Sequence, residues 1–267
     1  MTGPIFDTHA HYSSRAFDAD RIALLDSLPD KGVVGVCEQA THSGDAPRVL
    51  ELAHRYPWVV AAIGIHPESL LPAADCGEEG PAPTVSVYGG DWAAEMQALM
   101  PYYDDPKVVA VGECGLDYHW PVPKDAQLAL FEAEIRLALE LDKPIIVHDR
   151  QAHADVYDLL KKYRPKGIVH CYSGSAEDAV QLAAQGLYIG FGGACTFNGA
   201  KRAAKAIEAL PLDAIVLETD CPYMAPEPVR GIRCDSSLIR YVGEYVASVK
   251  GISPEEVFRQ TAQNAKA

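Results

Sequence analysis

The chain has 267 residues, of which 48% are hydrophobic and 22% are charged, and its formal net charge is −14. This balance is ordinary for a soluble globular protein. The acidic charge argues against a broad basic surface for duplex DNA or for anionic lipid. It leaves open a nucleic-acid substrate held in a local site by metal ions, because bound cations can invert the local potential.

Membrane and secreted classes are not indicated. The apolar run from Trp58 to Ile65 is too short to span a bilayer. No basic segment followed by an apolar stretch opens the chain, so we expect no secretory signal. The seven cysteines contain no C-x-x-C pair, which argues against a disulfide scaffold and against a thiolate zinc cluster. We therefore expect a protein of the reducing cytoplasm.

Short apolar runs alternate with amphipathic segments along the whole chain. The predicted strands are Pro4–His9, Gly32–Cys37, Trp58–Ile65, Lys107–Glu113, Pro144–His148, Gly167–His170, Leu187–Phe191 and Asp213–Thr219. The predicted helices are Asp18–Leu28, Asp45–Tyr56, Asp91–Tyr103, Lys124–Leu141, His153–Tyr163, Ala176–Gln185, Gly199–Leu210 and Ser237–Val249, with a last helix capped by Ser253. Strands that are apolar on both faces are typical of a buried parallel sheet.

Eight such strand–helix pairs predict an α/β fold, a single (β/α)₈ TIM barrel over residues 1–267. A doubly wound open sheet is the alternative. The segment Leu71–Gly90, rich in proline and glycine, predicts a long loop insertion, either a solvated surface loop or a lid.

Seven side chains that could bind a metal follow six of the predicted strands: His9, His11, His66, Glu113, His148, His170 and Asp220. A lone histidine at a strand end is more often a hydrogen-bonded core or rim residue. In a barrel, however, the carboxyl ends of all strands meet at one mouth. His9 and His11 are two residues apart, so they face the same side of an extended strand. The joint pattern therefore predicts a metal site.

The donors are imidazoles and carboxylates, which suit Zn, Mn, Co, Ni or Mg without choosing among them. Two carboxylates and four histidines are too many for one tetrahedral ion. They suit two ions about 3.5–4 Å apart with a shared ligand, an arrangement that activates water for hydrolysis. The bond cleaved could be a phosphoester, an amide or a lactone.

The motifs around these residues resemble the TatD family of metal-dependent deoxyribonucleases, of the amidohydrolase superfamily. They lie in the family's order at 7–11, 64–67, 112–118, 144–148, 169–174, 190–193 and 217–223. The resemblance implies a 3′–5′ deoxyribonuclease acting at DNA ends. The alternatives are hydrolysis of a small amide, ester or lactone, and a non-catalytic scaffold. The intact ligand set argues against the scaffold, and no obligate protein partner is evident.

The resemblance also implies residue roles. His9, His11 and Asp220 would hold the first metal ion, His148 and His170 the second, and Glu113 would bridge the two. Asp220 would accept a proton from the attacking water, and His66 would lie close to the scissile phosphate.

Three arginines, Arg150, Arg230 and Arg233, are candidates for phosphate binding, with salt bridges to acidic residues as the alternative. After the last predicted strand the family has the pattern Arg-Gly-x-x-Asn-x-Pro. This sequence keeps Arg-Gly at 230–231 but has Cys234-Asp235-Ser236 in place of Asn-x-Pro. We expect this loop at the barrel mouth, where it would affect the choice of substrate.

Overall fold

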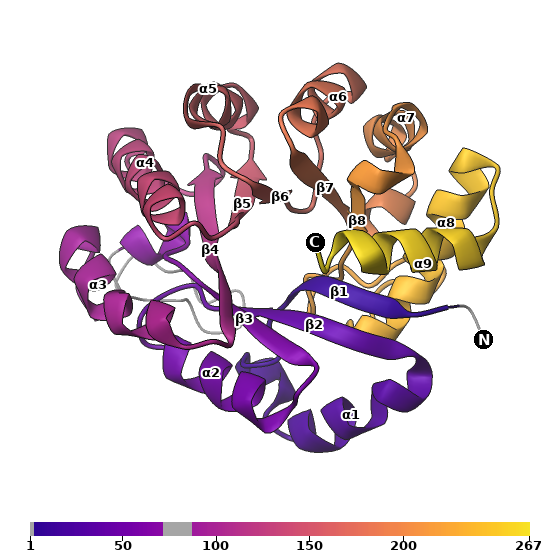
Figure 1. The fold of residues 1–267 in the computed structure, drawn as a ribbon, viewed down its shortest axis with the longest axis horizontal. Helices are drawn as coiled ribbons and strands as arrows, with labels where there is room; N and C mark the ends of the chain where they lie inside the picture. The colour runs from indigo at the N-terminus through magenta and orange to yellow at the C-terminus, as the bar shows by residue number, and fades with distance from the viewer. Residues whose placement is uncertain (1–2, 72–86) are drawn as a thin grey trace. The chain divides into compact units, whose positions relative to one another are not determined.

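The computed structural model describes residues 3–71 and 87–267 and contains eight strands in one sheet (Figure 1). The strands are β1 Ile5–Ala10, β2 Val33–Gln39, β3 Val59–Ile63, β4 Val108–Asp117, β5 Ile145–Arg150, β6 Gly167–Val169, β7 Leu187–Phe191 and β8 Ile215–Leu217. The helices are α1 Arg21–Ser27, α2 Ala46–Arg55, α3 Trp92–Leu99, α4 Lys124–Glu140, α5 His153–Tyr163, α6 Ala176–Ala184, α7 Lys201–Ala209, α8 Ile239–Lys250 and α9 Pro254–Asn264. Helices therefore alternate with strands, as the sequence predicts.

The strands follow one another in the sheet in chain order, from β1 to β8. A parallel bridge between Ala10 and Cys221 joins the carboxyl end of β1 to the segment after β8. An open doubly wound sheet would reverse its strand order and leave both edges unpaired. The strand order and this bridge confirm the (β/α)₈ class and exclude the alternative.

Seven of the eight strands differ from their predicted bounds by one or more residues, and β4 and β8 differ most. β4 runs four residues past Glu113, as far as Asp117, because its end pairs with β5 up to Arg150. β8 is shorter than predicted, because the chain first forms a 3₁₀ turn over Leu212–Ala214, closed by the Ala214 N–H on the Pro211 carbonyl at 3.1 Å. The N-cap of α9 is as predicted: the Ser253 side chain accepts the Glu256 N–H.

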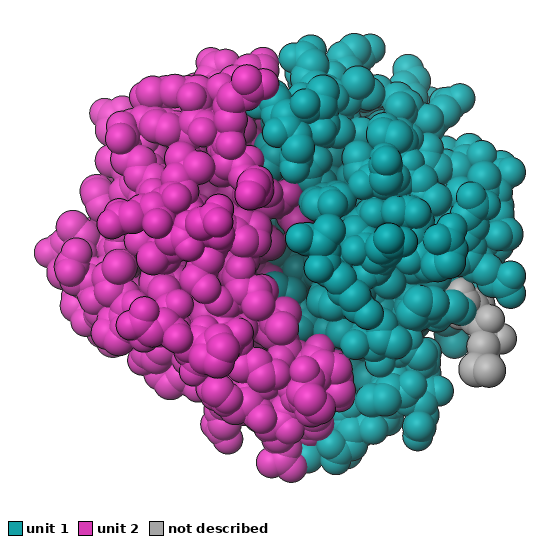
Figure 2. All heavy atoms as spheres, viewed as in Figure 1, with its two compact units in different colours: residues 1–37, 169–267 teal, residues 38–168 magenta. Residues whose placement is uncertain are grey.

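The chain divides into two compact units, coloured separately in Figure 2. Residues 1–37 and 169–267 form unit 1, in which β7 pairs with β8 and α8 packs on α9. Residues 38–168 form unit 2, in which α4 packs on β4 and β4 pairs with β3 and β5. The single domain expected from the sequence stays a prediction.

Most of the predicted loop insertion at 71–90 lies outside the described residues. None of the helices in the described ranges combines the length and the apolar composition needed to cross a bilayer.

Candidate metal centre

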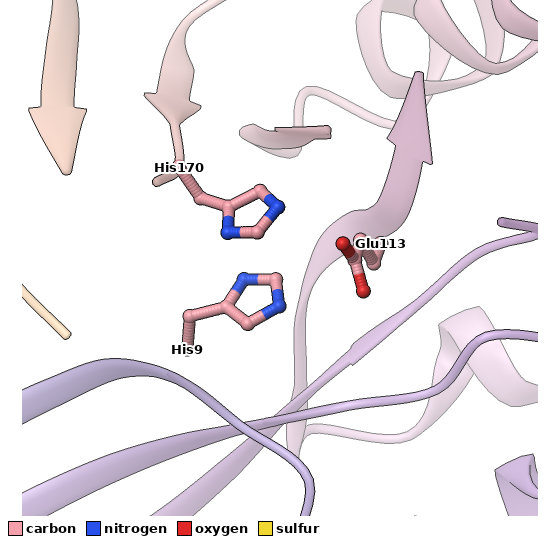
Figure 3. Close-up of side chains that lie close together, drawn as sticks. All are labelled: His9, Glu113 and His170. Atoms are coloured by element: carbon pink, nitrogen blue, oxygen red, sulfur yellow. The ribbon is translucent and has the colours of Figure 1, made fainter. Parts of the chain in front are cut away.

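Unit 1 brings together three predicted ligands, one on β1 and the others in the segments that follow β1 and β8. The Asp220 Oδ1 atom lies 3.3 Å from His11 Nε2 and 3.8 Å from His9 Nε2, and the two Nε2 atoms are 3.2 Å apart. Each residue offers a ligand atom within 4.8 Å of the others. His170, after β6, stacks its ring on that of His9 with centroids 3.8 Å apart (Figure 3). Four predicted ligands thus converge within this unit.

Backbone pairing explains how β1 and β8 present these side chains together. The Asp220 N–H donates to the His9 carbonyl, and the His11 N–H donates to the Cys221 carbonyl, both at 2.9 Å. Asp220 has a left-handed φ of 58°, which aspartate adopts more readily than most residues. The turn at Asp220 therefore directs its carboxylate toward the histidines of β1.

The charge of Asp220 is set by two opposed effects. Burial favours its neutral form, but a hydrogen bond from His11 and the nearby His9 and His170 rings outweigh burial and lower the pKa of the Asp220 carboxyl below its usual value. Its side chain is 17% exposed, so solvent reaches it. Asp220 is therefore an ionised carboxylate that water can approach.

A buried carboxyl, Asp7, supports the base of this cluster. Asp7 Oδ1 accepts the His9 and Thr219 N–H groups, and Oδ2 accepts the hydroxyls of Thr219 and Ser236 at 2.6 and 2.7 Å. Burial raises the pKa of Asp7 to about 7, although these hydrogen bonds oppose the rise. Asp7 fixes the backbone on both sides of the ligand-bearing strand ends.

The loop that departs from the family pattern belongs to this support. The side chains of Cys234 and Ser236 are fully buried, and Ser236 contacts Tyr12 as well as Asp7. Asp235 caps the following 3₁₀ turn, Ser236–Leu238. Cys234 and Ser236 therefore act through the interior of unit 1 rather than as exposed groups at the mouth.

Glu218, which sequence reasoning did not single out, holds the segment that carries His170. Its carboxylate accepts the Cys171 N–H and lies 3.7 Å from His170 Nδ1. A Cβ at Gly190 would meet this carboxylate at 2.4 Å, so glycine is needed there. The only signal for Glu218 in the sequence is its place two residues before Asp220.

Unit 2 holds a second cluster of predicted residues, His66, Glu113 and His148, whose ligand atoms also lie within 4.8 Å of one another. The Glu113 side chain projects from β4 (Figure 3), and its Oε1 atom lies 3.0 Å from His148 Nδ1 and 3.7 Å from His66 Nε2. Glu113 is 4% exposed. Its carboxylate is thus the common contact of two histidines.

Two glycines let β4 bring Glu113 to this position. The register between β4 and β5 shifts between Val111 and Cys114, the stretch that holds Glu113. A Cβ at Gly112 would meet the Ile146 carbonyl oxygen at 2.8 Å, and one at Gly64 would meet the Gly112 backbone at 2.7 Å. Larger residues at either glycine would push the strands apart.

The two histidines beside Glu113 have different partners on their other nitrogen. His66 Nδ1 accepts the Glu68 N–H at 3.2 Å, so in the neutral ring Nε2 carries the hydrogen. His148 Nε2 lies 3.0 Å from Asp117 Oδ2. His66 therefore presents a donor toward Glu113.

Asp117 is a second residue that sequence reasoning missed. Burial disfavours its charge, but the hydrogen bond with His148, the His119 N–H and the nearby His148 and His66 rings together outweigh burial and lower the pKa of Asp117 below its usual value. Asp117 lies four residues beyond the predicted end of this strand, so the pattern of polar residues at strand ends did not indicate it.

A buried carboxyl on α4 holds the segment before His66. Glu134 Oε1 accepts the Ile65 N–H at 2.8 Å, while Oε2 has no hydrogen-bond partner among the described residues. Burial, with the nearby Glu95 adding to it, raises the pKa of Glu134 well above its usual value. A neutral Glu134 thus serves mainly as an acceptor for Ile65.

Two substitutions of Glu134 separate its role as the hydrogen-bond acceptor for Ile65 from the effect of its raised pKa. Glu134→Leu leaves the Ile65 N–H unpaired and should lower the free energy of unfolding by about 1–3 kcal/mol. Glu134→Gln keeps the acceptor. Because the folded-state pKa is raised, the stability contributed by wild-type Glu134 is lost as pH rises above the unfolded-state pKa. Urea unfolding at pH 4 and pH 8 should therefore show Glu134→Gln gaining on wild type at the higher pH. An unchanged difference would contradict the neutral carboxyl.

The three candidate arginines differ in their partners. Arg233 donates to both carboxylate oxygens of Asp20, at 2.8 and 2.6 Å, and is thus engaged in a salt bridge. Arg230 lies over the Phe197 ring at 4.1 Å. Neither Arg230 nor the exposed Arg150 forms an ion pair within the described ranges. Arg150 and Arg230 are therefore the freer of the three to bind phosphate.

The fold and the donor clusters together define a metal-dependent hydrolase built on a (β/α)₈ barrel. The family model "TatD related DNase" matches residues 6–267, and the chain belongs to this family. The expected family and the expected class of metal-dependent hydrolase are thereby confirmed.

Individual relatives agree with this assignment. The metal-dependent hydrolase YabD of Bacillus subtilis is 37% identical over 98% of this chain and 97% of its own. The 3′-5′ ssDNA/RNA exonuclease TatD of Erwinia tasmaniensis is 29% identical over 98% of both chains. The crystal structure of YjjV, a TatD homologue from Escherichia coli, has a TM-score of 0.84 at 28% identity and covers 99% of this chain and 97% of its own. These comparisons do not favour the small amide, ester or lactone.

Proposed function

We propose that the protein is a 3′–5′ exonuclease that removes nucleotides from single-stranded DNA ends with two divalent metal ions. The observation that carries the proposal is the pair of donor clusters, one containing Asp220 and the other containing Glu113. In each cluster the ligand atoms lie within 4.8 Å of one another. Support for the substrate comes from the Erwinia relative, a 3′-5′ ssDNA/RNA exonuclease.

The donor set fits the proposed ions. Imidazole and carboxylate ligands suit Zn²⁺, Mn²⁺, Co²⁺, Ni²⁺ and Mg²⁺ alike. In this proposal His9, His11 and Asp220 would hold one ion, His148 and His170 would hold the other, and Glu113 would be a ligand shared by both. When bound, the ions would lower the pKa of a water and stabilise the charge on the phosphate oxygens.

The residues of the chain supply the remaining functions. The Asp220 carboxylate, ionised and partly open to solvent, accepts a proton from the attacking water at Oδ1. The His66 Nε2–H donates to an oxygen of the scissile phosphate, because Nδ1 is already engaged by Glu68. Arg150 and Arg230 bind flanking phosphates. A cytoplasmic location, and the absence of an obligate protein partner, stay predictions.

Cleavage of a 5′-labelled single-stranded DNA oligonucleotide tests the proposal. With Mg²⁺ or Mn²⁺ we expect a ladder of products that shortens from the 3′ end, and chelator should abolish it. Absence of cleavage with metal content confirmed would reject the nuclease and return attention to a small-molecule substrate.

A further inference from the structure

His148 offers two nitrogens, and each faces a carboxylate. Nδ1 lies 3.0 Å from Glu113 Oε1, and Nε2 lies 3.0 Å from Asp117 Oδ2. A histidine binds a metal through one deprotonated nitrogen, and the partner of the other nitrogen fixes which one it is. The two carboxylates must therefore be compared.

The Asp117 carboxylate also accepts a hydrogen bond at its other oxygen. Its Oδ1 atom accepts the His119 N–H at 2.9 Å, and its side chain is 1% exposed. The Gln127 side chain accepts the Asp117 N–H at 2.8 Å and donates to the Asp117 carbonyl at 2.9 Å. Asp117 is thus held in place from both sides, with Oδ2 left to accept from His148.

The Glu113 side faces another proposed ligand. Glu113 and His148 belong to one group of converging ligand atoms, and that group does not include Asp117. A cation would therefore replace the proton on the Nδ1 side of His148 and leave the Nε2–H in place.

We infer that Asp117 is a positioning residue: it accepts the Nε2–H of His148 and so makes Nδ1 the atom that binds the metal. The inference deepens the proposed function and rests on its metal ligands. Asparagine cannot take this role, because both Asp117 oxygens accept an N–H and an amide offers only one oxygen. Either the His119 N–H or the His148 Nε2–H would then face an amide NH₂.

The chain holds a matched control at the other end of β4. Asp105 Oδ1 accepts the Lys107 N–H at 2.9 Å, and Oδ2 lies 2.7 Å from His54 Nε2. The arrangement is the same as at Asp117: one carboxylate oxygen accepts the N–H of the residue two positions later, and the other oxygen lies beside the Nε2 atom of a histidine. The Asp105 pair lies outside the ligand groups among the described residues. Asp105→Asn therefore makes the same chemical change without touching a proposed ligand.

The test is ¹⁵N NMR of the histidine side chains with one diamagnetic probe, Zn²⁺, and a His148→Gln variant to assign the signal. In Zn²⁺-loaded wild type we expect His148 to keep its Nε2–H and to show the metal shift at Nδ1. The reverse pattern in wild type overturns the inference, whether or not any variant folds.

Metal affinity supplies the second readout. Asp117→Asn should weaken binding of the second Zn²⁺ by about 10–100-fold in calorimetry, as is typical when the partner of a metal-bound histidine is lost. Asp105→Asn should leave it unchanged. Equal affinities in Asp117→Asn and wild type would overturn the inference. Failure of the nuclease assay with both zinc results as expected would instead reject only the substrate.

Discussion

Asp220→Asn is expected to lower the rate of metal-dependent DNA hydrolysis by about 10²–10⁴-fold, the usual contribution of a positioned general base. The amide cannot accept the proton of the attacking water, although it keeps the size of the side chain. Because His9 and His11 remain in place, at least one metal ion should stay bound. Single-turnover rates and elemental analysis of the purified variant measure the two effects separately.

A matched control lies at the opposite end of β8. Asp213 is an exposed carboxylate two residues before the strand, and Asp213→Asn should leave both the rate and the metal content at wild-type values. Turnover by Asp220→Asn at the rate of Asp213→Asn would remove Asp220 from the role of base.

The spacing of apolar residues, and the polar residues at the ends of apolar runs, predicted those parts of the fold and site that depend on neighbouring residues in the sequence. The bounds of α5 and β7 match the prediction, and those of α4 differ by one residue, because the local spacing of apolar residues indicates these elements. The proposed ligands His9, His11 and Asp220 were predicted because they stand at or just past the ends of predicted strands.

Residues that act through tertiary partners could not be predicted in this way. Asp117 lies beyond the predicted end of β4, and its partner His148 is on the next strand, so no short pattern links them. The burial of Ser236 depends on a hydrogen bond to Asp7, 229 positions away in the sequence. Such long-range partners are set by how the strands pack. The expected effect of the 234–236 loop on the choice of substrate stays a prediction.

Glu113→Gln should reduce the metal content from the proposed two ions per chain to one or none. A bridging carboxylate offers two negatively charged oxygens, whereas an amide offers one neutral oxygen and one NH₂ group. The loss would also leave His148 Nδ1 without its acidic neighbour at 3.0 Å. Elemental analysis after dialysis against a defined Mn²⁺ concentration measures the change.

Glu134→Gln provides the control for this experiment, because Glu134 is an equally buried glutamate of the same unit that contacts the Ile65 backbone instead of a ligand. It should retain the wild-type metal content. If Glu113→Gln also retains it, Glu113 does not bridge, and the two clusters would bind their ions independently. Loss of a single ion together with most of the activity would instead show that hydrolysis depends on both ions, because the histidines of unit 1 can still hold the first.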